Sequence, residues 1–225
     1  MNKIARPIVW VLGFAIALVA IYTAAFGIID EIYQRSITVA VSVILSIFAT
    51  PLAGLYQSDK KHIKAGQWAV DFILIFLMAL SILWFSSVYD ELESGLYSFL
   101  PIDIAVGCGG LIVVIEMTRR CFGTPLAFFA VLTIVYALFG ADLPWIFAHG
   151  GYDLESVMRT VWYSFDGVFG FIVIIVISLI FIFIIFGTVL EATGAGATLL
   201  KISVSLTGAM RGGPAHAAIA ASGFF

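Results

Sequence analysis

The sequence predicts an all-α membrane protein: a polytopic transmembrane helical bundle with six spans, a cytoplasmic amphipathic helix and the first arm of a re-entrant hairpin. Hydrophobic residues make up 62% of the 225 residues and charged residues only 11%, whereas a soluble domain is about 25% charged. The apolar residues also run in long uncharged stretches, and backbone within a bilayer must satisfy its own hydrogen bonds in helices. Strands of a membrane barrel would instead alternate apolar and polar residues, which excludes that class.

Six stretches are long and apolar enough to span the bilayer, since crossing about 30 Å takes roughly 17 to 25 helical residues. They are residues 8–29, 37–56, 68–89, 102–118, 125–141 and 168–190. The first is too long for a signal peptide, so we expect it to remain as an uncleaved span. The break between the fourth and fifth spans rests on Arg119, Arg120 and Gly123, and Pro125 is suited to opening the next helix.

The distribution of Lys and Arg predicts the orientation, because short loops rich in these residues stay in the cytoplasm. With the N-terminus inside, only Arg35 and Arg159 would lie on the outer side. The cytoplasmic set would then be Lys3, Arg6, Lys60, Lys61, Lys64, Arg119, Arg120, Lys201 and Arg211. We therefore expect a cytoplasmic N-terminus. The longest loop, residues 140–167, would be outside, and we expect it to be structured and to contain a short interfacial helix.

The chain changes character after the sixth span. Residues 193–196, Thr-Gly-Ala-Gly, end the span, and residues 200–207 then alternate apolar and polar side chains. That alternation is a strand pattern, but a lone strand would have no partner. Read as a helix, the segment has one apolar stripe, formed by Leu199, Ile202, Leu206 and Met210. We therefore expect a short amphipathic helix on the cytoplasmic face.

A Gly-Gly-Pro break then precedes a run of small residues, 215–223, that is too short to span. This pattern suits the first arm of a re-entrant hairpin, and the missing second arm suggests the N-terminal piece of a longer protein. Backbone breaks at membrane depth are tolerated mainly beside cavities, so Gly212, Gly213 and Pro214 either line a substrate or ion cavity or serve only to turn the chain.

Ionisable residues within spans are the usual functional pointers in membrane proteins. Glu116 precedes Arg119 and Arg120 on one helical face, which predicts a local ion pair, with a proton or cation relay as the alternative. Asp71 and Asp103 fall in the first turns of spans, where the headgroup region and the helix dipole tolerate carboxylates. Glu191 closes the sixth span, as an interfacial residue or as part of a hinge.

Nothing in the sequence supports an enzyme, because no catalytic triad, nucleotide-binding loop or metal-ligand cluster is present and the three histidines lie far apart. Cys108 and Cys121 lack metal or disulfide spacing and suit inert packing. The glycines of the fourth span predict close helix packing; they are Gly107, Gly109 and Gly110.

Several motifs together carry a family resemblance. They are Gly167-Val168-Phe169-Gly170, Phe186-Gly187-Thr188-Val189-Leu190-Glu191, Thr193-Gly194-Ala195-Gly196, Arg211-Gly212-Gly213-Pro214-Ala215 and, upstream, Glu116-Met117-Thr118-Arg119-Arg120. In these motifs the chain resembles the large permease subunit of tripartite ATP-independent periplasmic (TRAP) transporters, especially the fused permeases that work with TAXI-type receptors. Two departures, Thr193 for a frequent Ser and His216 for a frequent Lys, lie outside the expected binding tip.

The resemblance implies three regions: a small-permease-like four-span domain (1–122), a connecting span with an outer loop (123–165) and the start of the transport domain (166–225). In the family, the tip of the first hairpin helps to form the sodium and substrate sites. Ser222 and Gly223 would belong to the arm leading to that tip. Gly194 and Gly196 would be hinges of an elevator-like motion.

The resemblance further implies a permease of the bacterial inner membrane that imports a small organic anion, expected to be a carboxylate. A periplasmic solute-binding protein would deliver the anion, and a sodium or proton gradient would drive uptake without a bound cofactor. The residues alone leave two alternatives open. One is a membrane scaffold or assembly subunit without a transport path; the other, a channel, lacks any visible ring of charge or filter-like motif.

Overall fold

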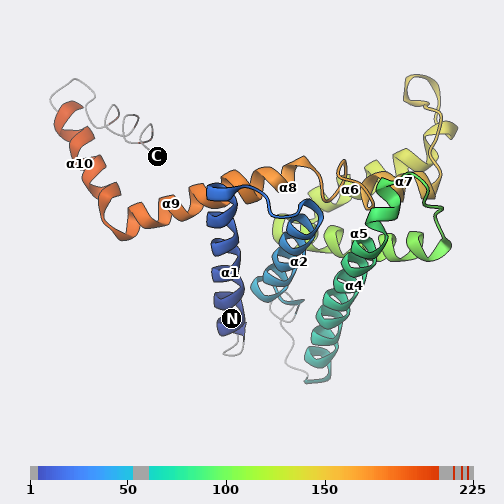
Figure 1. Cartoon of the computed structure of the whole chain (residues 1–225), viewed down its shortest axis with the longest axis horizontal. Helices are drawn as coiled ribbons and strands as arrows, with labels where there is room; N and C mark the ends of the chain where they lie inside the picture. Colours follow the sequence, from blue (N-terminus) through green and yellow to red (C-terminus); the bar gives the residue numbers. More distant parts are fainter. Residues whose placement is uncertain (1–4, 53–60, 208–214, 216–218, 220–221, 223–225) are drawn as a thin grey trace.

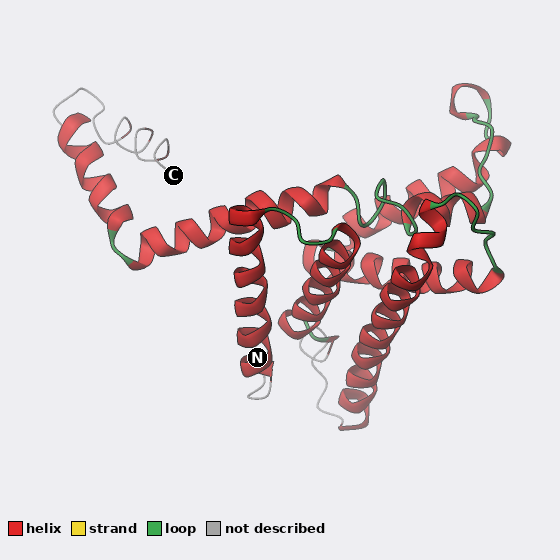
Figure 2. Cartoon of the chain, in the orientation of Figure 1, coloured by secondary structure: helices red, strands yellow, loops and turns green. Residues whose placement is uncertain are grey.

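The computed structural model describes residues 5–52, 61–207, 215, 219 and 222, which form helices joined by loops, with no strand among these residues (Figures 1 and 2). The α-helices are α1 (Ala5–Phe26), α2 (Glu31–Ala49), α4 (Lys61–Glu93), α5 (Pro101–Phe122), α6 (Thr124–Phe139), α7 (Leu154–Val161), α8 (Phe171–Ile175), α9 (Phe181–Ala192) and α10 (Ala195–Thr207). Two short 3-10 turns, η1 (Gly140–Asp142) and η2 (Trp145–Phe147), lie in the long loop. A π-helical segment, η3 (Val176–Ile180), joins α8 to α9.

Six of the described helices are long and apolar enough to cross a membrane, which confirms the predicted fold class. Several helix limits differ from prediction, and at the start of the second span a polar residue caps the helix. The second span begins at Glu31 rather than residue 37, since the Asp30 carboxylate accepts a hydrogen bond from the Tyr33 amide at 3.1 Å. The same span ends at Ala49, so the predicted end at residue 56 is wrong, and that position lies outside the described residues. The fourth span continues through its two arginines to Phe122.

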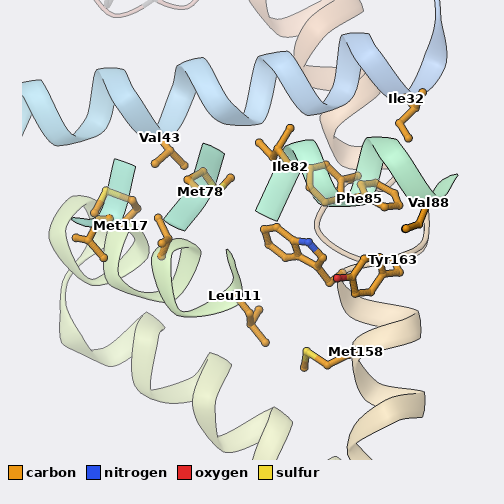
Figure 3. Close-up of a cluster of buried hydrophobic side chains, with 14 of the residues drawn as sticks. Ile32, Val43, Met78, Ile82, Phe85, Val88, Leu111, Met117, Met158 and Tyr163 are labelled. Carbon is orange, nitrogen blue, oxygen red and sulfur yellow. The ribbon is translucent and has the colours of Figure 1, made fainter. Parts of the chain in front are cut away.

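A packed core forms where α2, α4, α5 and α7 meet (Figure 3). Figure 3 shows Val43 of α2 above Met78 and Ile82 of α4, with Leu111 of α5 and Met158 of α7 closing the other side. The loop after α7 adds large aromatic side chains to this core, and Trp162 and Phe169 are fully buried. The helix predicted within residues 140–167 is therefore present as α7, but it packs into the core with Val157 and Met158 buried.

The sixth span is one continuous helix from Phe171 to Ala192, composed of α8, η3 and α9, and is called here the sixth-span helix. It crosses the C-terminal end of α1 and the N-terminal end of α2 (Figure 1). After Gly194 the chain changes direction and continues as α10, which contacts α9 and extends away from the packed core. Residues 200–207 form a helix, as predicted, although their side chains alternate as in a strand. The placement of α10 on the cytoplasmic face remains a prediction.

Candidate functional site at the anchored start of the sixth-span helix

Arg35 connects α2 to the segment that leads into the sixth-span helix. Its guanidinium donates to the Phe169 carbonyl at 2.7 Å, pairs with Glu31 and lies 3.9 Å from the centroid of the Phe165 ring. Only 5% of Arg35 is exposed. The burial has a physical reason, because a carboxylate, a carbonyl and an aromatic face surround the guanidinium. The side of the membrane on which Arg35 lies remains a prediction.

Phe169 also belongs to an aromatic cluster, defined as Phe85, Trp162, Tyr163 and Phe169. The ring of Phe169 stacks on Phe85 at 4.9 Å between centroids and meets Trp162 edge-on at 5.1 Å. Tyr163 contacts Phe85 edge-on at 5.7 Å. Aromatic pairs in these geometries each contribute about 0.5–1.5 kcal/mol beyond burial. The aromatic cluster and Arg35 together hold the start of the sixth-span helix against α2 and α4.

Two glycines of α5 make room for this cluster. A Cβ atom on Gly110 would lie 2.2 Å from the Trp162 ring, and one on Gly107 would lie 3.0 Å from the Tyr163 ring. Gly109 differs, because its Cβ would only make an ordinary contact of 3.7 Å with Leu77. The prediction of close packing is thus confirmed for Gly110 and Gly107, whose nearest neighbours come from the segment after α7 and, at Gly110, also from Ser81 of α4.

Asp103 organises a second buried network at the start of α5. Its carboxylate accepts hydrogen bonds from Trp84 Nε1 at 2.7 Å, Tyr97 Oη at 2.9 Å and the Leu100 amide at 2.6 Å. Burial, together with the Asp103 carboxylate, raises the pKa of Tyr97 to about 12. The phenol therefore stays protonated near neutral pH and remains a donor. The Asp103 carbonyl in turn accepts from the Tyr163 hydroxyl at 2.7 Å, and burial first of all raises the pKa of Tyr163.

The predicted ion pair of Glu116 is confirmed and belongs to a larger cluster. Glu116 accepts from Arg119 at 2.8 Å and from Arg120 at 2.7 Å, and Arg120 also donates to Asp71 at 2.6 Å. Asp71 accepts a further bond from the Leu52 amide at 3.1 Å. Asp71 lies near the start of the candidate span Gly66–Glu93, is 1% exposed and is paired with a fully buried guanidinium, and its depth in the membrane remains a prediction. The cluster joins α4, α5 and the end of α2.

The sixth-span helix contains a π-helical segment that the sequence did not indicate. Over Val176–Ile180 the helix widens, and Ser178 Oγ bonds the Ile174 carbonyl at 2.7 Å. Such segments interrupt α-helices most often at functional positions. This one begins seven residues after Phe169, so the helix departs from regular geometry soon after the point where Arg35 and the aromatic cluster hold it.

Of the two predicted hinge glycines, one lies at the turn between α9 and α10. Gly194 has φ +73° and its amide donates to the Glu191 carbonyl at 3.1 Å, as at many helix ends where glycine adopts the left-handed conformation. Gly196 lies in the first turn of α10. Glu191 is exposed near the end of α9. The hinge roles remain predictions.

The predicted cavity residues lie mostly outside the described residues. This holds for Gly212, Gly213, Pro214 and Gly223, while Ser222 is exposed and donates to the Ile219 carbonyl at 2.8 Å. Among the residues that the structure does describe, no group of three or more metal-ligating side chains converges. Cys108 and Cys121 are free thiols.

A comparison with protein families gives one match, described as "Tripartite ATP-independent periplasmic transporter, DctM component", over residues 110–225. The chain belongs to this family. No curated protein and no solved structure matches it. The chain is thus a membrane permease component of a TRAP transporter, and it is a multi-pass protein of the bacterial inner membrane.

The TRAP match begins at Gly110, within α5, and so starts upstream of the predicted region boundaries at residues 122 and 165. It includes Glu116 with its two arginines, the aromatic residues after α7, the π-helical segment and the Gly194 turn. Arg35, Asp71 and Phe85 lie before the matched residues and contact them. The permease region is therefore held by side chains from the part of the chain that precedes the match.

A cleft of about 290 Å³ lies between α2, α5 and the start of the sixth-span helix. Thr38, Ser42, Ser46 and Thr118 contribute hydroxyl groups to a lining that is otherwise mainly apolar. No Lys, Arg or His lines it among the described residues, so it offers no cation to a carboxylate. This cleft does not account for the anion that TRAP permeases of the predicted kind would carry.

Proposed function

We propose that the chain forms the membrane part of a secondary transporter that imports a small organic anion, a carboxylate, delivered by a periplasmic solute-binding protein of the TAXI type. A cation gradient, of sodium or protons, drives uptake. Membership in the DctM family is the observation that carries this proposal. The six candidate spans support it, because a secondary transporter needs several helices to enclose a path across the bilayer.

The packed core then serves as the static part, and the sixth-span helix begins the moving part. The packed core suits the static role because the buried Asp71–Arg120 pair and the Asp103 network both join its helices. Gly194 and Gly196 act as hinges. Gly212, Gly213, Pro214, Ser222 and Gly223 form the arm that leads to the substrate and ion cavity.

The natural full-length protein, reconstituted with its solute-binding protein, tests the proposal. Uptake of a radiolabelled carboxylate should require the binding protein and should stop when both the sodium and the proton gradients are collapsed. Substituting Gly212 and Gly213 together by alanine should abolish uptake, whereas Gly109→Ala, whose new methyl meets only an ordinary contact, should leave uptake intact. Uptake that persists without gradients contradicts the coupling. A correctly folded protein with no uptake under any condition favours the scaffold.

The proposed orientation places the N-terminus in the cytoplasm and needs its own test. In a protein without its two native cysteines, Lys60→Cys and Glu155→Cys provide a pair of positions on opposite sides. Lys60 lies outside the described residues, and Glu155 is exposed on α7. A membrane-impermeant maleimide should label Glu155→Cys in intact spheroplasts and Lys60→Cys only after permeabilisation. The reverse pattern would show that the orientation is inverted.

A further inference from the structure

The outer loop presents an exposed apolar tip formed by Trp145, Ile146 and Phe147. These side chains are 91%, 79% and 61% exposed, respectively. Three consecutive large apolar side chains with this exposure need an explanation, because most large hydrophobic side chains at a protein surface are single. The tip lies outside the sixth-span helix and the packed core, and nothing in the proposed transport function uses it.

The tip is fixed to the end of α6. Gly151 N donates to His149 Nδ1 at 3.0 Å, so the other ring nitrogen, Nε2, carries the proton and donates to the Tyr136 carbonyl at 2.9 Å. Tyr136 Oη donates to the Phe147 carbonyl at 3.1 Å, and Tyr152 N donates to the Ala137 carbonyl at 3.1 Å. The imidazole fits closely against Gly140, where an added Cβ would lie 1.7 Å from Nε2. The loop is thus held in a defined conformation by hydrogen bonds to the end of α6.

The backbone at the tip is strained. Among the described non-glycine residues, Trp145 is the one with a positive φ, at +66°. Residues with side chains adopt this conformation rarely, and when they do it often marks a functional position. The Trp145 side chain is almost fully exposed, so its own contacts within the chain do not offset the strain.

The position and the charge of the tip indicate its partner. The candidate span that contains α6 runs from Thr124 to Asp142, so the loop begins where the chain leaves the hydrocarbon and is bonded back to that level. Tryptophan and other aromatic residues concentrate at this headgroup level of membranes. Residues 140–161 contain three acids, Asp142, Asp153 and Glu155, and one cation, Arg159, which pairs with Glu155 at 3.3 Å. A surface of this kind is apolar and acidic, which disfavours anionic lipids as its partner.

We propose that the Trp145–Phe147 tip is a membrane-interface anchor that inserts into the headgroup and upper acyl region of zwitterionic lipids at the C-terminal end of α6. The His149 and Tyr136 contacts hold the tip in the plane of the interface. The anchor fixes the depth of α6 and of the loop that leads to α7. It does not depend on the transported solute or on the coupling ion.

A depth measurement tests the anchor. Ile146→Cys, in a protein that also carries Cys108→Ala and Cys121→Ala, is labelled with an environment-sensitive fluorophore and reconstituted into phosphatidylcholine vesicles. The fluorophore should emit at shorter wavelength than in water, be quenched by nitroxides on lipid headgroups and upper acyl chains, and resist aqueous iodide. Glu155→Cys, labelled in the same way, should show the emission and the iodide quenching of an aqueous site.

Two matched variants test whether the built loop holds the anchor. Adding Gly140→Ala displaces His149 and should shift the Ile146→Cys label toward its aqueous emission, whereas Gly150→Ala has nothing within 4 Å of the new methyl and should leave the emission unchanged. The Ile146→Cys label should be less deeply inserted in vesicles rich in phosphatidylglycerol than in phosphatidylcholine vesicles. If the cysteine-substituted protein does not fold, the native protein and Trp145→Phe are each reconstituted with dibrominated lipids. The fraction of total tryptophan emission that these lipids quench should be larger in the native protein.

Three outcomes of these measurements would overturn the proposal. An Ile146→Cys label that is quenched by iodide and not by lipid nitroxides excludes insertion. A label that stays aqueous until a solute-binding protein is added would instead identify the tip as a protein contact. Equal quenching of the native protein and Trp145→Phe by brominated lipid would also exclude the anchor. A failure of uptake assays would leave these measurements unaffected.

Discussion

The packed core and the sixth-span helix are both built from apolar segments long enough to cross a membrane, yet their side chains are held very differently. A third of the most apolar window of α5 is buried within the chain, against 6% of the window in Phe171–Ala192. The core helices carry an ion pair and a carboxylate network between them, whereas α9 has no buried residue. Apolar composition therefore places a helix in the membrane, and a few polar and close-packed positions determine which helices stay together.

The largest expected effect comes from breaking the buried charge pair of the core. Arg120→Met leaves Asp71 as an unpaired buried carboxylate and should destabilise the protein by about 3–5 kcal/mol, visible as a lower melting temperature in detergent. Combining it with Asp71→Leu removes both charges and should recover most of the loss. Arg119→Met, at a guanidinium that is partly exposed, should change stability by about 1 kcal/mol or less. A double variant as unstable as Arg120→Met would show that the pair is not the source of the effect.

The next largest effect on stability is expected at Gly110, where the lack of a side chain leaves room for the aromatic cluster. Gly110→Ala places a methyl group 2.2 Å from Trp162 and should destabilise the protein by about 1–3 kcal/mol through overpacking. Gly109→Ala, one position away on the same helix, should be neutral or stabilising by up to about 1 kcal/mol, because alanine favours the helix. Trp162→Phe removes the two ring atoms closest to the new methyl and leaves Ser81 Oγ at 2.6 Å, so the double variant should lose less stability than the two single changes add up to. Similar melting temperatures for Gly110→Ala and Gly109→Ala would contradict the packing.

The sequence predicted the existence of the helices better than their limits and contacts. Six long apolar runs suffice to indicate six spans, because hydrocarbon thickness sets a minimum length. The sequence does not indicate the helix start at Glu31, because the polar pair Asp30-Glu31 suits a loop as well as a helix start, and here Asp30 caps the helix. The π-helical segment has no signal in a run where nearly every residue is a large hydrophobe.

The side-chain contacts also divide into those that the sequence predicts and those that it does not. Glu116 and its arginines were predicted because their spacing of three and four residues is local to one helix. The partners of Asp71 and Arg35 lie 49 and 134 residues away, and a single sequence gives no sign of such contacts. Gly110 and Gly109 look alike in sequence, and they differ only through the positions of Trp162 and Ser81 in the fold. The cavity residues around Gly212 remain predictions, since they lie outside the described residues.

A smaller effect is expected at the turn that ends the sixth-span helix. Gly194→Ala forces a side chain into the left-handed conformation and should destabilise the protein by roughly 1 kcal/mol. Gly187→Ala, in the regular part of α9 with nothing within 4 Å of the new methyl, should stabilise the helix by up to about 1 kcal/mol. Thermal unfolding of both variants in one detergent measures the difference. A Gly194→Ala protein at least as stable as Gly187→Ala would show that the turn does not need its glycine.

The smallest effect should come from the face of the sixth-span helix itself. Ile184 is 57% exposed within the chain, so Ile184→Ala removes few internal contacts and should change the stability of the isolated protein by about 0.5 kcal/mol or less. Ile47, on α2, is 1% exposed, and Ile47→Ala should destabilise by roughly 2 kcal/mol. This loss of stability is at the low end for a buried isoleucine. In a membrane most of the loss comes from missing packing contacts, because lipid is itself apolar and the transfer contribution is small. Melting temperatures of the two variants in the same detergent measure the contrast directly. Equal losses would mean that the sixth-span helix is packed as tightly as the core, and the difference between the two regions would disappear.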